Sequence, residues 1–481
     1  MFISLFQIKE QLEELNNLLL AKEKQYESLL AKVHPSQHLS AVNLLHYLTF
    51  RSQDIKELQQ ALHNHGFSSL INAEAYIRSQ VLSVLKHFGT YDQHPGTYET
   101  ASSLLEGRAN ELYGKSPGNS VPSIMVTLKT SHARDILAVK KLLRAGMNIA
   151  RINCAHDNED TWREMIVNVR KAIEVTGLPC KIYMDLAGPK IRTKIKGIKK
   201  QRVWLEEGDN FYLADNEVFK SKLPTVICTI PGIVKQLKPG ERVFFDDGLF
   251  EAKITGLQPG AAELEMVRVS AKKPYVKAEK GINFPDSELS LSALTEFDQA
   301  SLSFILQHAD LVGYSFVQNT DDLSILQRSM PEKKIPIILK IETPEGFKNL
   351  PHLLFKAMEE ECYGVMIARG DLAVELGFEK MSQVQEEISL LCEASHAPVI
   401  WATQVLETMN KSGLATRSEI TDASLSITAE CVMLNKGAHT VRAIKTLRTV
   451  LENTGTFRSK KKYLLRPLKI AKEFFERPET I

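Results

Sequence analysis

Hydrophobic residues at the start of the chain recur at helical spacing. Between residues 5 and 33, Leu, Ile and Val positions fall on one face of a helix, and Glu and Lys lie between them. This spacing predicts one amphipathic helix of about 30 residues that ends at His34-Pro35, with an apolar stripe suited to pairing with a second copy. Shorter helical patterns follow at residues 41–48, 54–64 and 72–88. We therefore predict an all-helical domain over residues 1–115.

The pattern changes after residues 116–119, whose Ser-Pro-Gly-Asn sequence is typical of a linker. Short apolar runs then alternate with amphipathic helical stretches, as parallel strands covered by helices do. Eight such runs predict an α/β fold with a closed (β/α)8 barrel, or TIM barrel, and leave an open doubly wound sheet as the alternative. The runs are residues 123–128, 148–153, 181–186, 310–316, 335–342, 364–369, 398–403 and 431–435.

One connection, between Arg192 and Asn283, is far longer than the others and contains no good helical pattern. Its short strand-like runs are separated by Pro-Gly, Glu-Gly and Asp-Gly, which predicts a small β-barrel domain inserted after the third strand. An insertion at the C-terminal end of a barrel strand lies over the mouth, where a lid belongs. The predicted domains are a helical domain (1–115), the barrel (120–194 and 281–455), the inserted β lid domain (195–280) and a basic tail (456–481).

Composition serves mainly to exclude classes of protein. The 481 residues include 60 Lys and Arg against 58 Asp and Glu, so the whole chain gives no electrostatic case for binding nucleic acid or membrane. Residues 1–115 carry 10 basic and 12 acidic residues, which argues against a DNA-binding helical domain. No apolar run approaches the roughly 18 residues of a membrane helix. Six single cysteines indicate buried, reduced thiols. We expect a cytoplasmic homo-oligomer.

Candidate catalytic groups are those at the C-terminal ends of the predicted strands. Lys340 and Glu342 end the fifth run and point to the same face, because side chains alternate along a strand. A Lys in an apolar strand is costly unless it is paired. Either the two residues form a structural ion pair, or Lys340 is a cation that stabilises transferred negative charge beside the Glu342 carboxylate. Asp371 follows Gly370 at the end of the sixth run, so Glu342 and Asp371 form a hard-oxygen site suited to Mg²⁺ or Mn²⁺.

Other polar residues follow neighbouring runs. Arg151 lies in the second run, Arg192 follows the third, and Thr403 ends the seventh. Two guanidinium groups at one mouth indicate an anionic, phosphorylated ligand, because their geometry matches phosphate oxygens. Either arginine alone is equally well explained by a surface ion pair.

Several sequence blocks, taken together, resemble the pyruvate kinase family in order and spacing. They are ARINCAH (150–156), MDLAGPKIRT (184–193), FDDGL (245–249), KGINFP (280–285), LKIETPEG (339–346), IARGDL (367–372) and WATQVLETM (401–409) followed by TRSE (416–419). The resemblance covers about residues 123–453. It implies transfer of a phosphoryl group from phosphoenolpyruvate to ADP, which gives pyruvate and ATP, with Mg²⁺ or Mn²⁺ as cofactor.

The resemblance also assigns roles to the residues around the metal. Lys340 supports the transferring phosphoryl group, and Glu342 and Asp371 are the divalent-metal ligands. Thr403 and the backbone amides of Gly370 and Asp371 hold the carboxylate and enolate of the substrate. Such a reaction needs cations placed around spreading negative charge and a site shielded from water, which a lid supplies.

On the phosphate side, the resemblance makes Arg151 a contact to both substrate and nucleotide phosphate, and Arg192 a less direct contact to substrate. Lys280, where the lid returns to the barrel, approaches the nucleotide phosphates. Asn153 belongs to the same nucleotide-binding group of residues.

The potassium site of the family is altered in this sequence. The family uses an Asn, a Ser, an Asp and a Thr, whereas this chain has Asn153, Ala155, Asp185 and Leu186, so two oxygen ligands are missing. The Glu of the family's Gly-Pro-Glu is Lys190 here, and its ammonium group takes the place of potassium. We therefore predict that potassium is not required.

The turns on the nucleotide side also differ from the family, at residues 127–132 and 435–439. No segment like the family's C-terminal regulatory domain follows the last barrel helix, so the family's sugar-phosphate regulation is not expected. Two alternatives therefore stay open: another phosphoryl acceptor or nucleotide-free, metal-assisted enolate chemistry at the same site, and a non-catalytic regulatory barrel. Retention of Lys340, Glu342 and Asp371 argues against the non-catalytic alternative, because buried charges serve stability poorly without their ligands.

Overall fold

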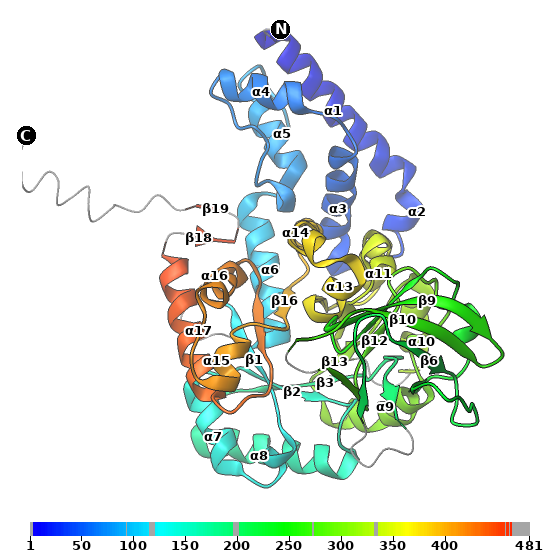
Figure 1. The fold of residues 1–481 in the computed structure, drawn as a ribbon. Helices are drawn as coiled ribbons and strands as arrows, with labels where there is room; N and C mark the ends of the chain where they lie inside the picture. Colours follow the sequence, from blue (N-terminus) through cyan, green and yellow to red (C-terminus); the bar gives the residue numbers. More distant parts are fainter. Residues whose placement is uncertain are drawn as a thin grey trace, which may run out of the picture.

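The computed structural model describes residues 3–92, 94–114, 121–195, 202–271, 274–330, 335–456, 458–460 and 462–463. The described chain has three parts: N-terminal helices, a barrel surrounded by helices, and a β-rich insertion on one side of the barrel (Figure 1). The predicted basic tail lies mostly outside these residues. At its start, β18 (Arg458–Ser459) pairs with β19 (Lys462–Tyr463).

Eight parallel strands form a closed barrel in the order β1-β17-β16-β15-β14-β13-β3-β2. All eight predicted runs are strands, so the closed barrel is confirmed and the open sheet is excluded. Nearly every strand residue is buried, because the strands are covered on both faces. The strands are β1 (Ser123–Thr127), β2 (Ile149–Asn153), β3 (Lys181–Asp185), β13 (Leu311–Tyr314), β14 (Ile337–Ile341), β15 (Tyr363–Ala368), β16 (Val399–Ala402) and β17 (Cys431–Leu434).

The helices that follow the strands have apolar faces toward the barrel and polar caps at their starts. Thr416, for example, forms a reciprocal cap with Glu419 at the start of α16, within the TRSE block. These helices are α7 (Ile136–Ala145), α8 (Glu159–Thr176), α9 (Glu296–His308), α10 (Thr320–Arg328), α11 (Pro344–Lys348), α12 (Leu350–Ala357), α13 (Arg369–Leu376), α14 (Met381–Ala394), α15 (Glu407–Ser412), α16 (Arg417–Leu425) and α17 (Thr440–Gly455). Short 3-10 turns are η3 (Thr130–Ala133), η4 (Val234–Gln236), η5 (Phe378–Lys380) and η6 (Ser426–Thr428).

Side-chain alternation along the strands divides the barrel into an inner and an outer core. Ile149, Tyr183 and Ile338 belong to the inner cluster, whereas their neighbours pack outward against the helices. Two residues further along the same strands, the inner positions are Arg151, Asp185 and Lys340. The inner face therefore changes from apolar to charged toward the C-terminal ends of the strands, where a barrel site lies.

The insertion after β3 is rich in β-structure, as predicted. The small barrel expected here is, in the described residues, a seven-stranded sheet and a separate pair, β11-β5. The insertion has its own hydrophobic core, in which Phe211, Phe245 and Phe250 are fully buried. Its strands are β4 (Thr193–Lys194), β5 (Arg202–Trp204), β6 (Asn210–Ala214), β7 (Thr225–Cys228), β8 (Arg242–Phe245), β9 (Phe250–Gln258), β10 (Ala261–Arg268), β11 (Tyr275–Lys277) and β12 (Ile282–Asn283).

The N-terminal region is helical, as predicted, but its first helix is shorter than the spacing indicated. α1 ends at Gln25, and the chain turns at Tyr26 before a short α2. The two apolar stretches have different partners: α1 packs on α3 and α5, whereas Leu30 belongs to the barrel core. The elements are α1 (Leu5–Gln25), α2 (Glu27–Leu30), η1 (Pro35–Gln37), α3 (His38–Arg51), α4 (Lys56–Asn64), η2 (Glu74–Tyr76), α5 (Ile77–Leu85) and α6 (Tyr98–Tyr113).

The apolar stripe of α1 is covered within the same chain. Ile8, Leu12 and Leu15 are buried in a cluster with residues of the following helices. The stripe that the sequence offered for pairing with a second copy is therefore used for intrachain packing. The expectation of a homo-oligomer is not tested by this arrangement and stays a prediction.

The last N-terminal helix, α6, closes the base of the barrel (Figure 1). Leu112 and Tyr113 belong to the inner barrel cluster, and the Tyr113 hydroxyl donates to the Pro398 carbonyl at 3.3 Å. A Cβ atom at Gly364 would lie 3.0 Å from that hydroxyl, so the close approach requires glycine. One turn earlier on α6, Arg108 donates to the backbone carbonyl of His396 at 3.0 Å. The helical region is thus attached to the barrel through its interior.

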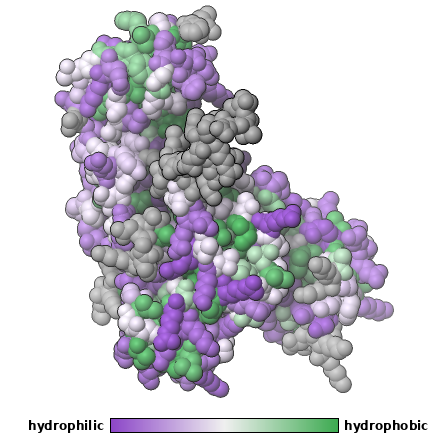
Figure 2. Space-filling model, turned by 90° about the vertical axis from the view of Figure 1, so that its left-hand side faces the viewer, coloured by the Kyte–Doolittle hydropathy of each residue, from purple (hydrophilic) through white to green (hydrophobic). Residues whose placement is uncertain are grey.

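Two further expectations concern the cysteines and membrane helices, and Figure 2 adds an observation on the surface. All six cysteines are free and buried, as predicted. Among the described residues, no helix combines the length and hydropathy needed to cross a membrane. On the face drawn in Figure 2, hydrophobic residues form small separate groups among hydrophilic ones.

Candidate active site

Lys340 and Glu342 extend from the end of β14 toward the barrel axis, as strand alternation predicted. Both are buried, with 6% and 4% of their surface exposed, and Lys340 Nζ lies 3.3 Å from Glu342 Oε1. The ammonium group also lies 3.2 Å from Asp185 Oδ2. Two carboxylates therefore compensate the buried cation, which is the condition under which a lysine is tolerated inside a barrel.

Asp185, at the end of β3, is the centre of this buried network. It accepts a hydrogen bond from Arg151 Nε at 3.0 Å and another from the Tyr183 hydroxyl at 2.8 Å, in addition to its contact with Lys340. Burial opposes the charged form, but Lys340 and Arg151 outweigh it and lower the pKa of the Asp185 carboxyl. For Arg151, burial is likewise outweighed by Asp185, and the pKa is raised. Both groups are therefore ionised at neutral pH.

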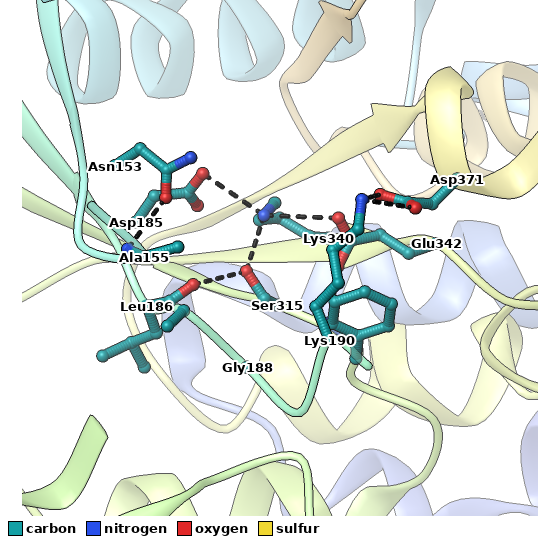
Figure 3. Close-up of polar contacts among 12 residues, drawn as sticks. Asn153, Ala155, Asp185, Leu186, Gly188, Lys190, Ser315, Lys340, Glu342 and Asp371 are labelled. Atoms are coloured by element: carbon teal, nitrogen blue, oxygen red, sulfur yellow. Dashed lines mark hydrogen bonds and ion pairs between the residues drawn. The ribbon is translucent and has the colours of Figure 1, made fainter. Parts of the chain in front are cut away.

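A serine from the neighbouring strand completes the surroundings of Lys340 (Figure 3). Lys340 Nζ donates to Ser315 Oγ at 2.6 Å, and the Ser315 hydroxyl donates to the Leu186 carbonyl at 2.6 Å. The next residue, Phe316, donates its backbone N–H to Glu342 Oε2 at 2.7 Å. The end of β13 thus fixes both side chains of the fifth predicted run.

Asp371 lies in the first turn of α13, beside Glu342 (Figure 3). Burial raises the pKa of Glu342; Lys340 opposes this, and the charges of Asp371 and Asp185 add to it. Two adjacent carboxylates are a donor set suited to a hard divalent cation, with the other positions left to water and substrate oxygens. The described residues include no group of three or more His, Cys, Asp or Glu that could hold a metal. A cation here would therefore depend on non-protein ligands.

Lys190 lies at Asp371, on the opposite side of Lys340 from Asn153 (Figure 3). Its ammonium group donates to both Asp371 oxygens, at 2.7 and 3.0 Å. Burial lowers the pKa of Lys190, but the Asp371 charge outweighs it and leaves that pKa raised. The sequence suggested that Lys190 takes the place of the family's potassium, which stays a prediction, and in this structure its charge lies at Asp371, a predicted metal ligand.

Thr403 follows β16 in a strained turn, with φ of 65°. Its hydroxyl is buried and has no hydrogen-bond partner among the described residues. A Cβ atom on Gly370 would lie 3.4 Å from this oxygen, so the hydroxyl faces the first turn of α13. Buried hydroxyls are nearly always hydrogen-bonded, so an unbonded one needs an explanation. A hydrogen bond to a bound ligand would supply it. The first-turn amides of α13 have no intrahelical acceptors and are available in the same way.

Three of the predicted residues lie outside the cluster. Arg192 is partly exposed and donates to the Glu279 carbonyl at 3.3 Å, and Lys280 pairs with Asp246 at 2.7 Å. The Asn153 side chain accepts from the backbone N–H of Ala155 at 3.1 Å. The structure therefore joins Lys340, Glu342, Arg151, Lys190 and Asp371 through direct contacts or shared charges, and leaves these three at the periphery.

The insertion reaches the site through the FDDGL turn between β8 and β9. Asp246, Asp247 and Gly248 all have positive φ, of 53°, 55° and 80°, so the turn holds a strained conformation. Burial raises the pKa of Asp247; Lys190 opposes this effect, and Asp371 strengthens it. Close by, Asn283 of β12 donates to Glu375 of α13 at 2.8 Å. The turn and this contact attach the insertion to the metal-ligand side of the mouth.

Sequence reasoning missed the roles of Asp185 and Ser315. Asp185 was considered only as a remnant of a potassium site. It lies two residues after Tyr183 in an apolar strand, on the same inward face, and a buried Asp there already required a cationic partner. Ser315 follows the fourth run, and nothing in its local sequence distinguishes it from a surface serine. Asp298 was also missed: it accepts from the backbone N–H groups of Ala187 and Gly188 at 2.7 and 3.1 Å and fixes the loop that carries Lys190.

A closed parallel barrel with a charged cluster at the C-terminal ends of its strands defines the class of (β/α)8 barrel proteins with a site at the mouth. The model of the pyruvate kinase barrel domain matches residues 121–444, which include the insertion. The chain belongs to the pyruvate kinase family.

Individual relatives agree with the family match. The chain is 33% identical to human pyruvate kinase PKLR over 67% of this chain and 58% of the relative. It is 31% identical to a pyruvate kinase of Geobacillus stearothermophilus over 65% of this chain and 54% of the relative. A pyruvate kinase of Staphylococcus aureus is 30% identical over 68% of this chain and 56% of the relative. The match thus spans little more than half the length of these relatives.

Proposed function

We propose that this chain catalyses magnesium-dependent transfer of a phosphoryl group from phosphoenolpyruvate to ADP, giving pyruvate and ATP. The observation that carries the proposal is the convergence of Lys340, Glu342 and Asp371, with the partnerless Thr403 hydroxyl facing the same helix turn. A purely structural ion pair accounts for Lys340 and Glu342. It does not account for a buried, unbonded hydroxyl or for the second carboxylate.

Each residue has a role that its position supports. Lys340, held by Ser315 and Asp185, stabilises negative charge on the transferring phosphoryl group without having to reorganise. Thr403 and the first-turn amides of α13 orient the substrate carboxylate and the developing enolate. Glu342 and Asp371 would hold Mg²⁺ or Mn²⁺, which supplies further neutralisation of phosphoryl charge when bound.

Lys190 must give up Asp371 for a divalent cation to bind that carboxylate. Its ammonium group then stays near the site, because Asp247 also faces it from the insertion. We propose that this local positive charge takes over the role of potassium. Steady-state rates with tetramethylammonium or potassium as the only monovalent cation should therefore differ by less than about tenfold. A tenfold difference corresponds to about 1.4 kcal/mol in the activation free energy. A larger increase with potassium would contradict this part of the proposal.

The test is a pyruvate-formation assay with phosphoenolpyruvate, ADP and Mg²⁺ on the wild type, Lys340→Met and a control, Lys348→Met. Lys348 lies on the same barrel segment but is 76% exposed in a surface pair. Turnover that is lost in Lys340→Met and kept in the control, with both variants folded by circular dichroism, supports the proposal. Turnover that is kept in Lys340→Met, or absent with every phosphoryl acceptor, overturns it.

A second candidate keeps the metal side of the site and changes the acceptor. It is favoured by the turns at residues 127–132 and 435–439, which depart from the family on the nucleotide side. The same assay separates the two when other nucleoside diphosphates and a nucleotide-free reaction run in parallel. Pyruvate formed faster with another acceptor, or with none, assigns the second function.

A further inference from the structure

One face of the β5–β11 pair in the insertion carries only aromatic and cationic side chains. Trp204 lies directly opposite Tyr275, and Arg202 lies directly opposite Lys277. The valine between them on each strand points the other way and is buried in the hydrophobic core of the insertion. We call this outer surface the aromatic–cationic face, defined by Arg202, Trp204, Tyr275 and Lys277.

The aromatic half of this face is exposed to solvent. Trp204 has 63% of its surface exposed, whereas the two other tryptophans of the chain, Trp162 and Trp401, have 1% and 3%. The Trp204 ring contacts the ring of Tyr275, with centroids 4.9 Å apart and planes at 61°. Leaving a large ring in water costs free energy that burial would recover. An exposed tryptophan supported by a second ring is therefore a surface on which a planar group can stack.

The cationic half of the face has no acidic counterpart. Arg202 Cζ lies 4.6 Å from the centroid of the Tyr275 ring, and Lys277 Nζ lies 5.6 Å from it. The ring attracts both cations but carries no net charge. In the part of the chain that the structure describes, neither cation has an ion-pair partner within 4.0 Å. Like charges directly opposite each other on paired strands repel, so this arrangement costs stability unless an anion binds there.

The sequence around the two strands has the same sign of charge. Residues 194–204 and 269–277 contain eight Lys or Arg and no Asp or Glu. The first acidic residues after the two strands are Glu206 and Glu279. The near-neutral balance of the whole chain therefore conceals a local excess of positive charge in these two segments, of the kind that attracts a polyanion.

We propose that the aromatic–cationic face binds single-stranded nucleic acid, with a base stacked on Trp204 and phosphates at Arg202 and Lys277. The aromatic and cationic rows are two residues apart along the strands, about 6.6 Å, so one nucleotide can contact both. Unpaired bases offer a π face to an aromatic ring, and cations bind phosphates with release of counterions. A duplex hides its bases in its own stack, and a bilayer surface offers no planar group. The proposal does not rest on phosphotransfer, because it uses no residue of the barrel mouth.

The experiment is a titration of the full chain with oligo(U) of about 12 nucleotides, a length within the range of single-strand sites, at about 50 mM salt. Quenching of tryptophan emission reports stacking on Trp204, because the other two tryptophans are buried. Fluorescence anisotropy of a labelled oligo(U) gives the Kd. We expect saturable binding accompanied by quenching.

Three variants separate stacking from charge. Trp204→Ala should raise the Kd about tenfold, and Trp204→Phe, which keeps a ring, should restore most of the affinity. Lys277→Gln should reduce the slope of log Kd against log salt concentration by about 0.7, the value for one phosphate contact on a single strand. The matched control is Lys253→Gln, at an exposed position on β9 of the same insertion, which should change neither quantity.

Four outcomes overturn the proposal. The first is no saturable binding of oligo(U) at low salt. The second is affinity that Trp204→Ala keeps in full, or that Lys253→Gln weakens as much as Lys277→Gln. The third is equal affinity for a duplex of the same length or for polyglutamate, since stacking would then contribute nothing. The fourth is binding to vesicles of equal parts phosphatidylserine and phosphatidylcholine without binding to oligo(U), which would make the face a membrane contact.

Discussion

The two sides of the barrel mouth treat charge in opposite ways. On the β3–β15 side, Lys340 contacts both Asp185 and Glu342, and Lys190 pairs with Asp371. On the β1–β17 side, four cations that line a cavity have no ion-pair partner among the described residues: Lys129, Lys141, Arg442 and Lys445. The difference teaches that folding pairs the charges of one side and leaves those of the other unpaired among the described residues. Removing one partner on the first side should therefore cost much more stability than removing one charge on the second.

The largest expected effect comes from breaking the balanced side. Asp185→Asn leaves Arg151 and Lys340 buried without their shared carboxylate, so the free energy of unfolding should fall by about 3–5 kcal/mol. Urea denaturation measures the change. The matched control is Asp286→Asn, whose pair with Arg242 is half exposed and should cost at most about 1 kcal/mol. Equal losses in the two variants would contradict the central position of Asp185.

Next in size is a change that separates binding from stability. The Thr403 hydroxyl is buried and has no hydrogen-bond partner in the part of the chain that the structure describes, so Thr403→Val should change the free energy of unfolding by less than about 1 kcal/mol. The same change should raise the apparent Kd of phosphoenolpyruvate about tenfold, because a ligand hydrogen bond is lost. Tryptophan fluorescence titration measures the affinity, and Thr403→Ser should restore it. Destabilisation by several kcal/mol with unchanged affinity would show that Thr403 is structural.

The pH dependence of stability should differ between the two sides. Burial, and then Lys129, lower the pKa of His132 below 6.5, so the unfolded chain binds its proton first. The His132 contribution is therefore full above about pH 6.5 and is lost as the pH falls through the folded pKa. The pKa of Asp185 is lowered from 3.8, so its contribution is lost only as the pH falls below that value.

Urea unfolding of the wild type and His132→Asn at several pH values checks this. The variant should lose less stability than the wild type just below pH 6.5, and Asn keeps an acceptor for the Lys129 amide. Parallel curves for the two proteins would contradict the depressed pKa of His132.

The smallest expected effect is a gain. Lys445→Gln removes one repelling charge one turn from Arg442, so the free energy of unfolding should rise by about 0.3 kcal/mol at low salt. The gain should disappear in about 0.5 M KCl, because salt screens exposed charges. A loss of stability at low salt would mean that the charges of Arg442 and Lys445 are compensated by other groups.

The fold was predictable because its signals are local. Eight continuous apolar runs were enough to indicate a barrel, and strand alternation placed Lys340 and Glu342 on one face. The partners of Lys190 were not predictable in this way. A lysine chain is long enough to reach several carboxylates, and tertiary packing alone selected Asp371. One cavity is lined by both Lys129 and Lys445, and the sequence around either residue does not indicate that the other lies near it.

The position of α6 has a consequence for how the barrel is made and dissected. Tyr113 precedes all eight barrel strands in the chain, so the ribosome synthesises α6 before the strands that pack around its end. A fragment that starts at residue 121, where the family match begins, lacks α6 and exposes the apolar inner base of the barrel to water. Such a fragment is expected to aggregate, and the smallest autonomous unit of this protein includes a helix that the family's barrel domain does not define.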